Sequence, residues 1–280
     1  MTDHQLDLSD GRTLRSYDTG PADAPLTVVW HHGTPNLGTP PAPLLPAAAR
    51  LGIRFVSYDR PGYGGSTPLP GRDIASAAAD TAALADALGI ERFAVLGHSG
   101  GGPHALACAA LLPDRVLAAA SVAGLAPYGA DGLDWYAGMT DSGVASLRAA
   151  AAGRAVKERH QQDHGADHDC EFTPGDLAAL HGVWSWFDTV VGPAVAAGPA
   201  ALIDDDLAYT APWGFDPGRI RTPVLLVHGE RDRIVPAAHS RWLADRIPTA
   251  DLRTRPDDGH VSVLTTAEDT LTRLAARATR

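Results

Sequence analysis

The chain has little lysine, little cysteine and no long apolar run, and each shortage excludes a class of protein. Lys157 is its only lysine, and 33 acidic residues outnumber 23 lysines and arginines, for a formal net charge of −10. The basic stripe that nucleic-acid binding requires is therefore missing. Cys108 and Cys170 are too few for a disulfide scaffold. Glycine, proline or a charge interrupts every apolar run before the roughly 18 residues that a membrane span needs.

The composition predicts a soluble globular protein. Asp3, Asp7, Asp10 and Asp18 stand where a secretory signal needs a basic start and an apolar run, so we expect no targeting segment there. Hydrophobic residues make up 45% and charged residues 20% of the 280 residues. That is enough for a full core, and it excludes a disordered or collagen-like chain. The expected compartment is a reducing cytoplasm.

Short apolar or β-branched runs alternate with longer segments rich in alanine and leucine. This alternation is typical of βαβ units, so we predict an α/β fold with a mostly parallel sheet. The first forty residues show no helical period, and residues 5–8 and 13–17 are expected to form an antiparallel edge. The best strand candidates are 26–30, 53–58, 93–96, 116–122 and 224–227, and helices are expected at 44–51, 74–88, 100–112, 239–246 and 263–277.

The alternation stops between Pro127 and Pro212, where the composition shifts to Gly, Ala, His and Asp with clustered aromatic residues. Because a strong strand resumes at residues 223–228, we interpret this stretch as an insertion rather than a second domain in series. The predicted organisation is a core of residues 1–126 and 213–280, interrupted by a helical cap at 127–212. A set of peripheral helices remote from any site is the alternative.

Residues 97–101 read Gly-His-Ser-Gly-Gly and carry the strongest chemical signal in the sequence. They follow a strand candidate and precede a helix, which is the setting of the G-x-S-x-G nucleophile elbow. Glycine at 97 and 101 lets strand and helix pass closely, while the turn strains the backbone of Ser99. A dinucleotide loop needs glycine in place of Ser99, and a phosphate loop needs Gly-Lys-Ser/Thr, so both motifs fail. A purely structural glycine turn remains the alternative.

Two later segments supply an acid and an imidazole in the chain order Ser, Asp, His. Asp232 lies in the loop after the strand at 224–227, and His260 ends the turn at 256–260. Serine needs an adjacent imidazole to take its proton, and the imidazole needs a carboxylate to fix its tautomer. A salt bridge of Asp232 with Arg231 or Arg233 is the alternative. The alternative acids are Glu230, Asp131 and Asp134.

Residues 31–35, His-His-Gly-Thr-Pro, directly follow the strand at 26–30 and are expected to complete an oxyanion hole. Such a hole needs two backbone amides aimed at the developing negative oxygen. One would come from Gly100, the residue after Ser99. The other is assigned to Thr34, because Pro35 has no amide hydrogen to give. A simple Gly-Pro turn is the alternative for this loop.

These segments together resemble the α/β-hydrolase superfamily, in its serine esterase branch with a cap after the sixth strand. The resemblance rests on residues 97–101, 32–35, 58–66 (Tyr-Asp-Arg-Pro-Gly-Tyr-Gly-Gly-Ser), 228–236 and 259–260, and it covers the chain apart from the insertion. It implies an eight-stranded sheet with an antiparallel second strand, Ser99 as nucleophile with Asp232 and His260 as partners, and no cofactor.

Two departures from the pattern narrow the superfamily. Its haloalkane dehalogenases and epoxide hydrolases carry an aspartate at the position of Ser99, so both activities are disfavoured. Its proline iminopeptidases carry a second glycine where Thr34 stands, which makes peptidase activity a weaker expectation.

Histidines and aromatic residues of the predicted cap each have two interpretations. His160, His164 and His168 recur every four residues, but Gly165 interrupts that helix and a serine triad needs no metal. We therefore expect a solvated surface and no metal site. The aromatic residues either wall an apolar substrate pocket, to which we assign them, or form the cap's own small core. They are Tyr136, Trp184, Trp186 and Phe187.

The sequence thus predicts a serine hydrolase that cleaves a small or medium ester, thioester or lactone through an acyl-enzyme intermediate. Ser99 attacks the carbonyl, His260 takes its proton, and the amides of Thr34 and Gly100 hold the oxyanion. Aminopeptidase or amidase activity, carbon–carbon bond hydrolysis and peracid formation are alternatives on the same residues, and a ligand-binding protein without turnover is another. The expected partner is a small-molecule substrate, with no cofactor, nucleic acid or membrane.

Overall fold

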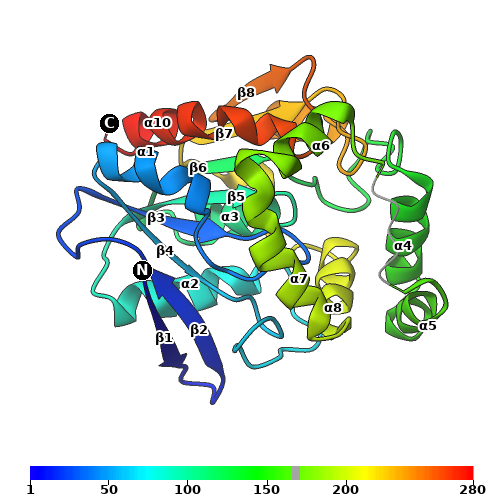
Figure 1. The fold of residues 1–280 in the computed structure, drawn as a ribbon, viewed down its shortest axis with the longest axis horizontal. Helices are drawn as coiled ribbons and strands as arrows, with labels where there is room; N and C mark the ends of the chain where they lie inside the picture. The colour runs from blue at the N-terminus through cyan, green and yellow to red at the C-terminus, as the bar shows by residue number, and fades with distance from the viewer. Residues whose placement is uncertain (166–170, 280) are drawn as a thin grey trace.

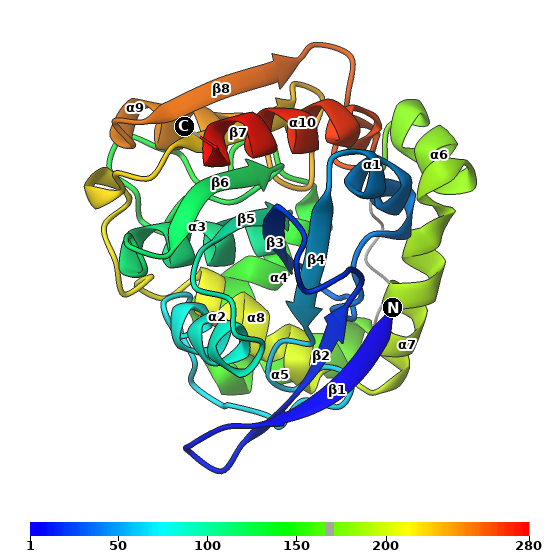
Figure 2. The ribbon, with the colours of Figure 1, turned by 90° about the vertical axis from the view of Figure 1, so that its left-hand side faces the viewer.

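The fold is organised around one eight-stranded sheet. The computed structural model describes residues 1–165 and 171–279, and the strand order is β1-β2-β4-β3-β5-β6-β7-β8. Figure 2 shows this order from β1 at the lower edge to β8 at the upper one. The strands are β1 (Thr2–Asp7), β2 (Thr13–Asp18), β3 (Leu26–His31), β4 (Ile53–Tyr58), β5 (Phe93–His98), β6 (Val116–Val122), β7 (Val224–Gly229) and β8 (Ala250–Arg255).

The direction of the strands confirms the predicted α/β class. β2 runs antiparallel to both β1 and β4, and every pair from β4 to β8 is parallel. The sequence prediction missed β8, which pairs with β7 at the sheet edge. This strand has no apolar run, since it reads Ala-Asp-Leu-Arg-Thr-Arg and is fully buried at no position.

Successive side chains along the central strands point to opposite faces of the sheet and so divide the core into two layers. In β3, Val28 and Trp30 pack on one side of the sheet and Val29 packs on the other, as the two-residue period of a strand requires. Helices α1 (Leu45–Arg50) and α10 (Ala267–Ala278) contribute to the first side. The second side is covered by α2 (Ser76–Ala87), α3 (Gly101–Leu111) and α9 (Ala238–Arg246).

The chain between β6 and β7 contains several helices. In Figure 1, α4 and α5 lie to the right of the sheet with α8 beside them, and α6 and α7 lie nearer the sheet. Thr140 caps α4 by accepting from the Gly143 amide, and Thr173 forms a capping box with Asp176 on α6. The elements are α4 (Asp141–Ala151), α5 (Arg154–His164), α6 (Pro174–His181), the 3₁₀ helix η2 (Val183–Phe187), α7 (Asp188–Ala196) and α8 (Ala200–Tyr209).

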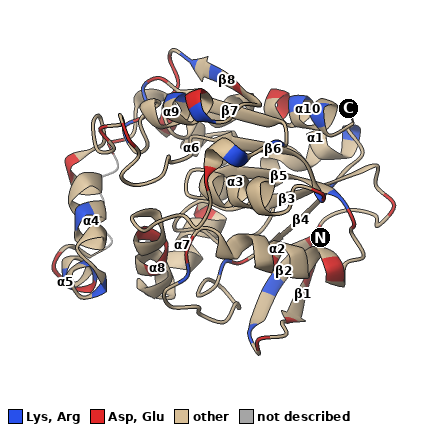
Figure 3. Cartoon of the chain, turned by 180° about the vertical axis from the view of Figure 1, so that it is seen from behind, with Lys and Arg blue, Asp and Glu red and all other residues tan. Residues whose placement is uncertain are grey.

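The outer elements carry charges of both signs. In the view of Figure 3, basic and acidic segments are interspersed over the outer elements. Among the described helices, none is by itself long and apolar enough to cross a membrane; residues 183–196 and 200–209 reach that length and hydropathy only as a pair bent by 103°.

Candidate active site

Ser99 stands on a sharp turn between β5 and α3. Its φ of 53° lies in the left-handed region that a side-chain-bearing residue rarely adopts. The turn is held because the Ser99 amide donates to the Val122 carbonyl at 2.8 Å and the Gly102 amide donates to the Ser99 carbonyl at 2.9 Å. The strained backbone therefore presents the Ser99 hydroxyl at the carboxyl end of the sheet, as the elbow motif predicts.

The glycines around Ser99 are required by close backbone contacts. A Cβ at Gly97 would lie 2.1 Å from the Gly101 carbonyl oxygen, and a Cβ at Gly101 would lie 2.0 Å from the His31 carbonyl oxygen. No real Cβ approaches backbone oxygen so closely. These two positions therefore let β5, α3 and the end of β3 converge on one point.

Three distant loops bring a hydroxyl, an imidazole and a carboxylate into one hydrogen-bonded row. His260 Nε2 lies 2.9 Å from Ser99 Oγ, and His260 Nδ1 lies 2.7 Å from Asp232 Oδ2. Since a carboxylate only accepts, the Nδ1 proton faces Asp232 and Nε2 is left to accept from Ser99. This is the arrangement that can remove a proton from the serine.

Asp232 is buried and firmly oriented. Its Oδ1 accepts from the amides of Ile234 and Val235, both at 2.9 Å. Burial by itself would raise the pKa of this carboxyl, but the charge and hydrogen bonds of His260 and His228 outweigh burial and lower the pKa well below its usual range. Asp232 is thus an anion at neutral pH. The alternative acid Glu230 instead pairs with Arg241.

The environment of His260 favours a basic imidazole. Burial opposes its charged form, but the Asp232 carboxylate overcomes that effect and raises the pKa of His260 above the ordinary 6.5. Its backbone is also fixed, because His98 Nε2 donates to the His260 carbonyl at 3.1 Å. Burial, reinforced by the neighbouring His260, lowers the pKa of His98 to about 3, so His98 is a neutral donor.

Thr34 and Gly100 lie side by side at the same pocket as Ser99. A Cβ at Gly100 would meet the Tyr209 hydroxyl at 2.0 Å and Thr34 Oγ1 at 2.8 Å. Thr34 Oγ1 is in turn 2.6 Å from the Tyr209 hydroxyl. The two residues whose amides were assigned to an oxyanion hole thus lie on neighbouring loops that border one pocket.

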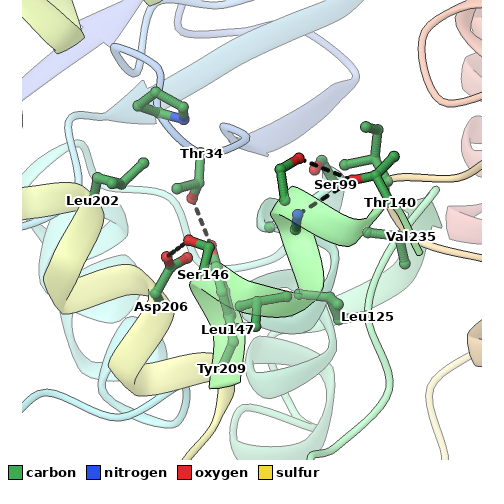
Figure 4. A pocket seen from close by; sticks show the side chains of 15 residues that line it. Thr34, Ser99, Leu125, Thr140, Ser146, Leu147, Leu202, Asp206, Tyr209 and Val235 are labelled. Atoms are coloured by element: carbon green, nitrogen blue, oxygen red, sulfur yellow. Dashed lines mark hydrogen bonds between the residues drawn. The ribbon is translucent and has the colours of Figure 1, made fainter. Parts of the chain in front are cut away.

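A pocket of about 180 Å³ opens beside Ser99. Its polar part includes Asp206 and Ser146, whose side chains lie side by side in Figure 4, and Ser146 Oγ is 3.4 Å from the Asp206 carboxylate. Lys157, the only lysine, is buried behind them and pairs with Asp206 at 2.6 Å. The apolar lining consists of Pro35, Leu125, Leu147, Leu202, Ile234 and Val235.

The aromatic residues that were assigned to the substrate pocket lie elsewhere. The described side chains that line the pocket include none of Tyr136, Trp184, Trp186 and Phe187. Trp184 and Phe187 are buried in the core layer of α1 and α10, with Trp186 packed against it, and Phe187 lies 5.8 Å from the His98 ring. Tyr136 packs against Tyr128 and Trp135. The assignment was wrong because these large apolar surfaces are buried against the core, where they gain more by leaving water.

Three supporting residues escaped the sequence prediction. Asp176 on α6 accepts from the amides of Val261 and Ser262, at 2.8 and 2.7 Å, and so anchors the loop that carries His260. Arg60 and Asp205 form a buried ion pair beside Thr34. A signal was present for Asp205, because it is the middle of three consecutive aspartates in an otherwise apolar segment, 200–209.

Of the histidines considered as metal ligands, His160 and His164 are the two that the structure describes. The rings of His160 and His164 stack at 4.4 Å on α5, and His168 lies outside the described residues. Over the ranges 1–165 and 171–279, no three His, Cys, Asp or Glu side chains are grouped so that they could hold a metal ion.

Comparison with known proteins gives consistent matches along the chain. The family model for the alpha/beta hydrolase fold matches residues 27–267. A non-heme chloroperoxidase from Streptomyces lividans is 31% identical over 235 residues, 82% of each protein. A bifunctional esterase/perhydrolase from Acinetobacter calcoaceticus is 27% identical over 266 residues, 92% of this chain and 93% of that protein. The structure of a hydrolase from Pseudomonas aeruginosa aligns with a TM-score of 0.74 at 22% identity, covering 98% of this chain and 97% of that one.

Proposed function

The chain belongs to the α/β-hydrolase fold family, whose model spans residues 27–267, and on this premise we propose that it is a serine hydrolase that cleaves small esters through an acyl-enzyme intermediate. Relatives named as esterases support hydrolysis of esters as the general activity. The observation that carries the proposal is the row Ser99 Oγ, His260 Nε2 and Asp232 Oδ2, joined at 2.9 and 2.7 Å beside a pocket.

The first half-reaction acylates Ser99. The Ser99 oxygen attacks the ester carbonyl while its proton passes to His260 Nε2, and Asp232 stabilises the imidazolium that results. The carbonyl oxygen becomes an oxyanion, which the amides of Thr34 and Gly100 hold. The carbon–oxygen bond to the alcohol then breaks, and the alcohol leaves with the proton from His260.

The second half-reaction releases the acid. Water gives a proton to His260 and attacks the acyl carbon, so that the bond to Ser99 breaks and the serine recovers its proton. Removal of the proton requires neutral His260, and the raised pKa of that residue places the rise of activity with pH above 6.5. Activity is therefore expected to be low in acid and to increase as His260 loses its proton.

The pocket favours a small acyl group. Its volume of about 180 Å³ lies below the roughly 300 Å³ at which pockets begin to enclose drug-sized ligands. The six apolar residues that line it suit a short hydrocarbon chain. The preferred substrates are thus short-chain esters or small lactones, while long acyl chains must extend into solvent.

The relatives favour one second candidate, which is peracid formation. The Acinetobacter relative is named as both esterase and perhydrolase. Hydrogen peroxide replaces water in the second half-reaction, attacks the same acyl carbon and leaves as the peracid, while Ser99 recovers its proton through His260. Release of peracid from a short-chain ester in the presence of peroxide, compared with acid release in its absence, separates the two activities.

The decisive experiment replaces the nucleophile. We expect Ser99→Ala to lose fluorophosphonate labelling and turnover of an activated aryl ester while its circular-dichroism melting curve stays like that of the wild type. Ser185→Ala, an exposed serine on η2, is the matched control and keeps both. Labelling that persists in Ser99→Ala shows that Ser99 is not the nucleophile. A wild type that shows neither labelling nor a burst of product released from the aryl ester indicates a ligand-binding protein. A panel of graded esters, lactones and aminoacyl amides then distinguishes esterase from amidase.

A further inference from the structure

Beneath the oxyanion loop lies a group of buried charges that the reaction described above does not use. Asp205 of α8 is fully buried and forms ion pairs with Arg60 at 2.7 Å and with Arg72 at 2.6 Å, and each arginine side chain is only 2% exposed. Tyr63 and Thr34 also donate to Asp205 Oδ2, at 2.8 and 2.5 Å. Burial opposes the anion, yet the two guanidinium groups hold the pKa of Asp205 well below its usual range.

Arg60 differs from Arg72 in what its other nitrogens touch. Its Nε and Nη2 bind the two oxygens of Asp205, at 3.1 and 2.7 Å. Its Nη1 donates to the His32 carbonyl, and Nη2 also donates to the Gly33 carbonyl at 2.9 Å. Arg60 therefore bridges α8 and the oxyanion loop, whereas Arg72 donates to Asp205 only through Nη2.

The contact with Gly33 bears directly on the oxyanion donor. The Gly33 carbonyl and the Thr34 amide belong to one peptide unit, and that peptide bond is trans. In a trans peptide the carbonyl and the N–H point in opposite directions. A guanidinium that holds the Gly33 oxygen on one side thus directs the Thr34 N–H to the other side.

His32 completes the restraint on the same peptide. Its Nδ1 donates to the Gly33 carbonyl at 2.7 Å, and its Nε2 accepts from the Arg60 amide at 3.0 Å. Burial, together with the charge of Arg60, lowers the pKa of His32 well below its ordinary value, so this ring is neutral and has one donor and one acceptor. Two donors, one of them cationic, therefore converge on the Gly33 oxygen, and a polarised carbonyl makes its peptide N–H a stronger donor.

We propose that Arg60, held by Asp205 of α8, is a positioning residue that orients and polarises the Gly33–Thr34 peptide so that the Thr34 amide stabilises the oxyanion. The inference rests on the proposed serine hydrolase function and deepens it. The contact between Asp205 and Arg60 also links the pocket wall to the catalytic step, because Leu202 and Asp206, which line the pocket, belong to α8 as Asp205 does. A substrate that displaces α8 would change the oxyanion hole through Asp205 and Arg60.

The test compares two lysine substitutions that differ in one respect. Arg60 and Arg72 are equally buried and both bind Asp205, but only Arg60 reaches the loop. Lysine keeps the charge and loses the fork that spans two carbonyls. We expect Arg60→Lys to lower kcat for p-nitrophenyl acetate by about 30- to 300-fold, in the range for a lost oxyanion donor, with KM nearly unchanged. Arg72→Lys is expected to retain kcat within about threefold, because a single contact is easier to replace.

A second readout separates positioning from general support of the fold. A trifluoromethyl ketone adds to Ser99 and places an oxyanion in the hole, so its inhibition constant should rise in Arg60→Lys by the same factor by which kcat/KM falls. Assays are run well below each variant's melting midpoint. Equal losses of kcat in both lysine variants, a loss confined to KM, or an unchanged ketone affinity would overturn the proposal.

A further pair of variants covers the case in which Arg60→Lys does not fold. Asp205→Asn loosens the hold on Arg60, and Asp204→Asn, the neighbour on α8 that pairs with Arg154, is the control. We expect kcat to fall about tenfold or more in the first variant only, since both lose charged hydrogen bonds but only Asp205 holds Arg60; similar kcat values in the two variants would contradict the role. Fluorophosphonate labelling of the wild type tests the serine hydrolase function on its own, so the two failures are distinguishable.

Discussion

Gly100→Ala offers a direct test of how closely the proposed oxyanion hole is packed. Gly100 has φ −54° and ψ −17°, which alanine adopts without strain. The cost therefore comes from the added methyl group alone. That Cβ would lie 2.0 Å from the Tyr209 hydroxyl and 2.8 Å from Thr34 Oγ1, whereas ordinary contacts begin at 3.4 Å.

The required displacement sets the size of the effect. Relief of the closest contact needs a movement of about 1.4 Å between Gly100 and Tyr209. Tyr209 is buried and bonded to Thr34, so much of the movement falls on the Gly100 amide. Misplacement of a catalytic group by about 1 Å costs on the order of 100-fold in rate. We therefore expect kcat/KM to fall about 100-fold, which corresponds to about 2.7 kcal/mol of transition-state stabilisation.

The assay is the steady-state hydrolysis of a short-chain p-nitrophenyl ester, with thermal unfolding followed in parallel. Gly192→Ala on α7 is the control, because a Cβ there has no neighbour within 4 Å beyond the adjacent residues of the chain; it should keep wild-type activity. Tyr209→Phe removes the hydroxyl oxygen that would lie closest to the added methyl group. The double variant, Gly100→Ala with Tyr209→Phe, should therefore be about tenfold more active than Gly100→Ala alone. Wild-type activity in Gly100→Ala, or no gain in the double variant, would refute this account of the hole.

Two further substitutions test the charges of the site. Asp232→Asn should lower kcat by about 10³- to 10⁴-fold; it should also move the rising limb of the pH profile of kcat/KM to lower pH, because the carboxylate that raises the pKa of His260 is gone while burial still lowers it. If the rising limb of the kcat/KM profile stays at the same pH, a group other than His260 determines the pH dependence. Lys157→Met removes the cation beside Asp206 and should destabilise the fold by about 3–5 kcal/mol, seen as a melting midpoint roughly 5–9 °C lower. Partial recovery in Lys157→Met with Asp206→Leu would trace the loss to the broken Lys157–Asp206 pair, and a wild-type midpoint in the single variant would contradict this explanation.

Local patterns in the sequence were sufficient for the central strands and for the three residues of the hydrogen-bonded row, Ser99, His260 and Asp232. β4 and β6 occupy the residues predicted for them, 53–58 and 116–122, because buried parallel strands are largely apolar runs. Short motifs placed Ser99 and Asp232 after the carboxyl ends of strands and His260 in the turn before the last helix, and the parallel sheet brings these loops to one edge. The contact among the three followed from this topology.

What the sequence did not reveal depends on packing between distant segments. Arg60 was part of a quoted motif, but its role appears only once α8 places Asp205 beside it, 145 positions later in the chain. The pocket wall likewise depends on how the helices after β6 settle, so Leu202 and Leu147 could not be distinguished from other apolar helix residues. The clustering of aromatic residues led to a wrong assignment because a side chain such as Trp184 suits a core as well as a pocket, and only the packing of the helices decides between them.

The enclosure of Lys157 between α4, α5 and α8 has a practical consequence. Its amine is fully buried and engaged with Ser146 and Asp206, and no other lysine occurs in the chain. Acylating reagents that modify lysine can reach it only when these helices separate. Mass spectrometry of the peptide around position 157 after timed exposure to such a reagent would therefore record how often this part of the molecule opens, with no engineered probe.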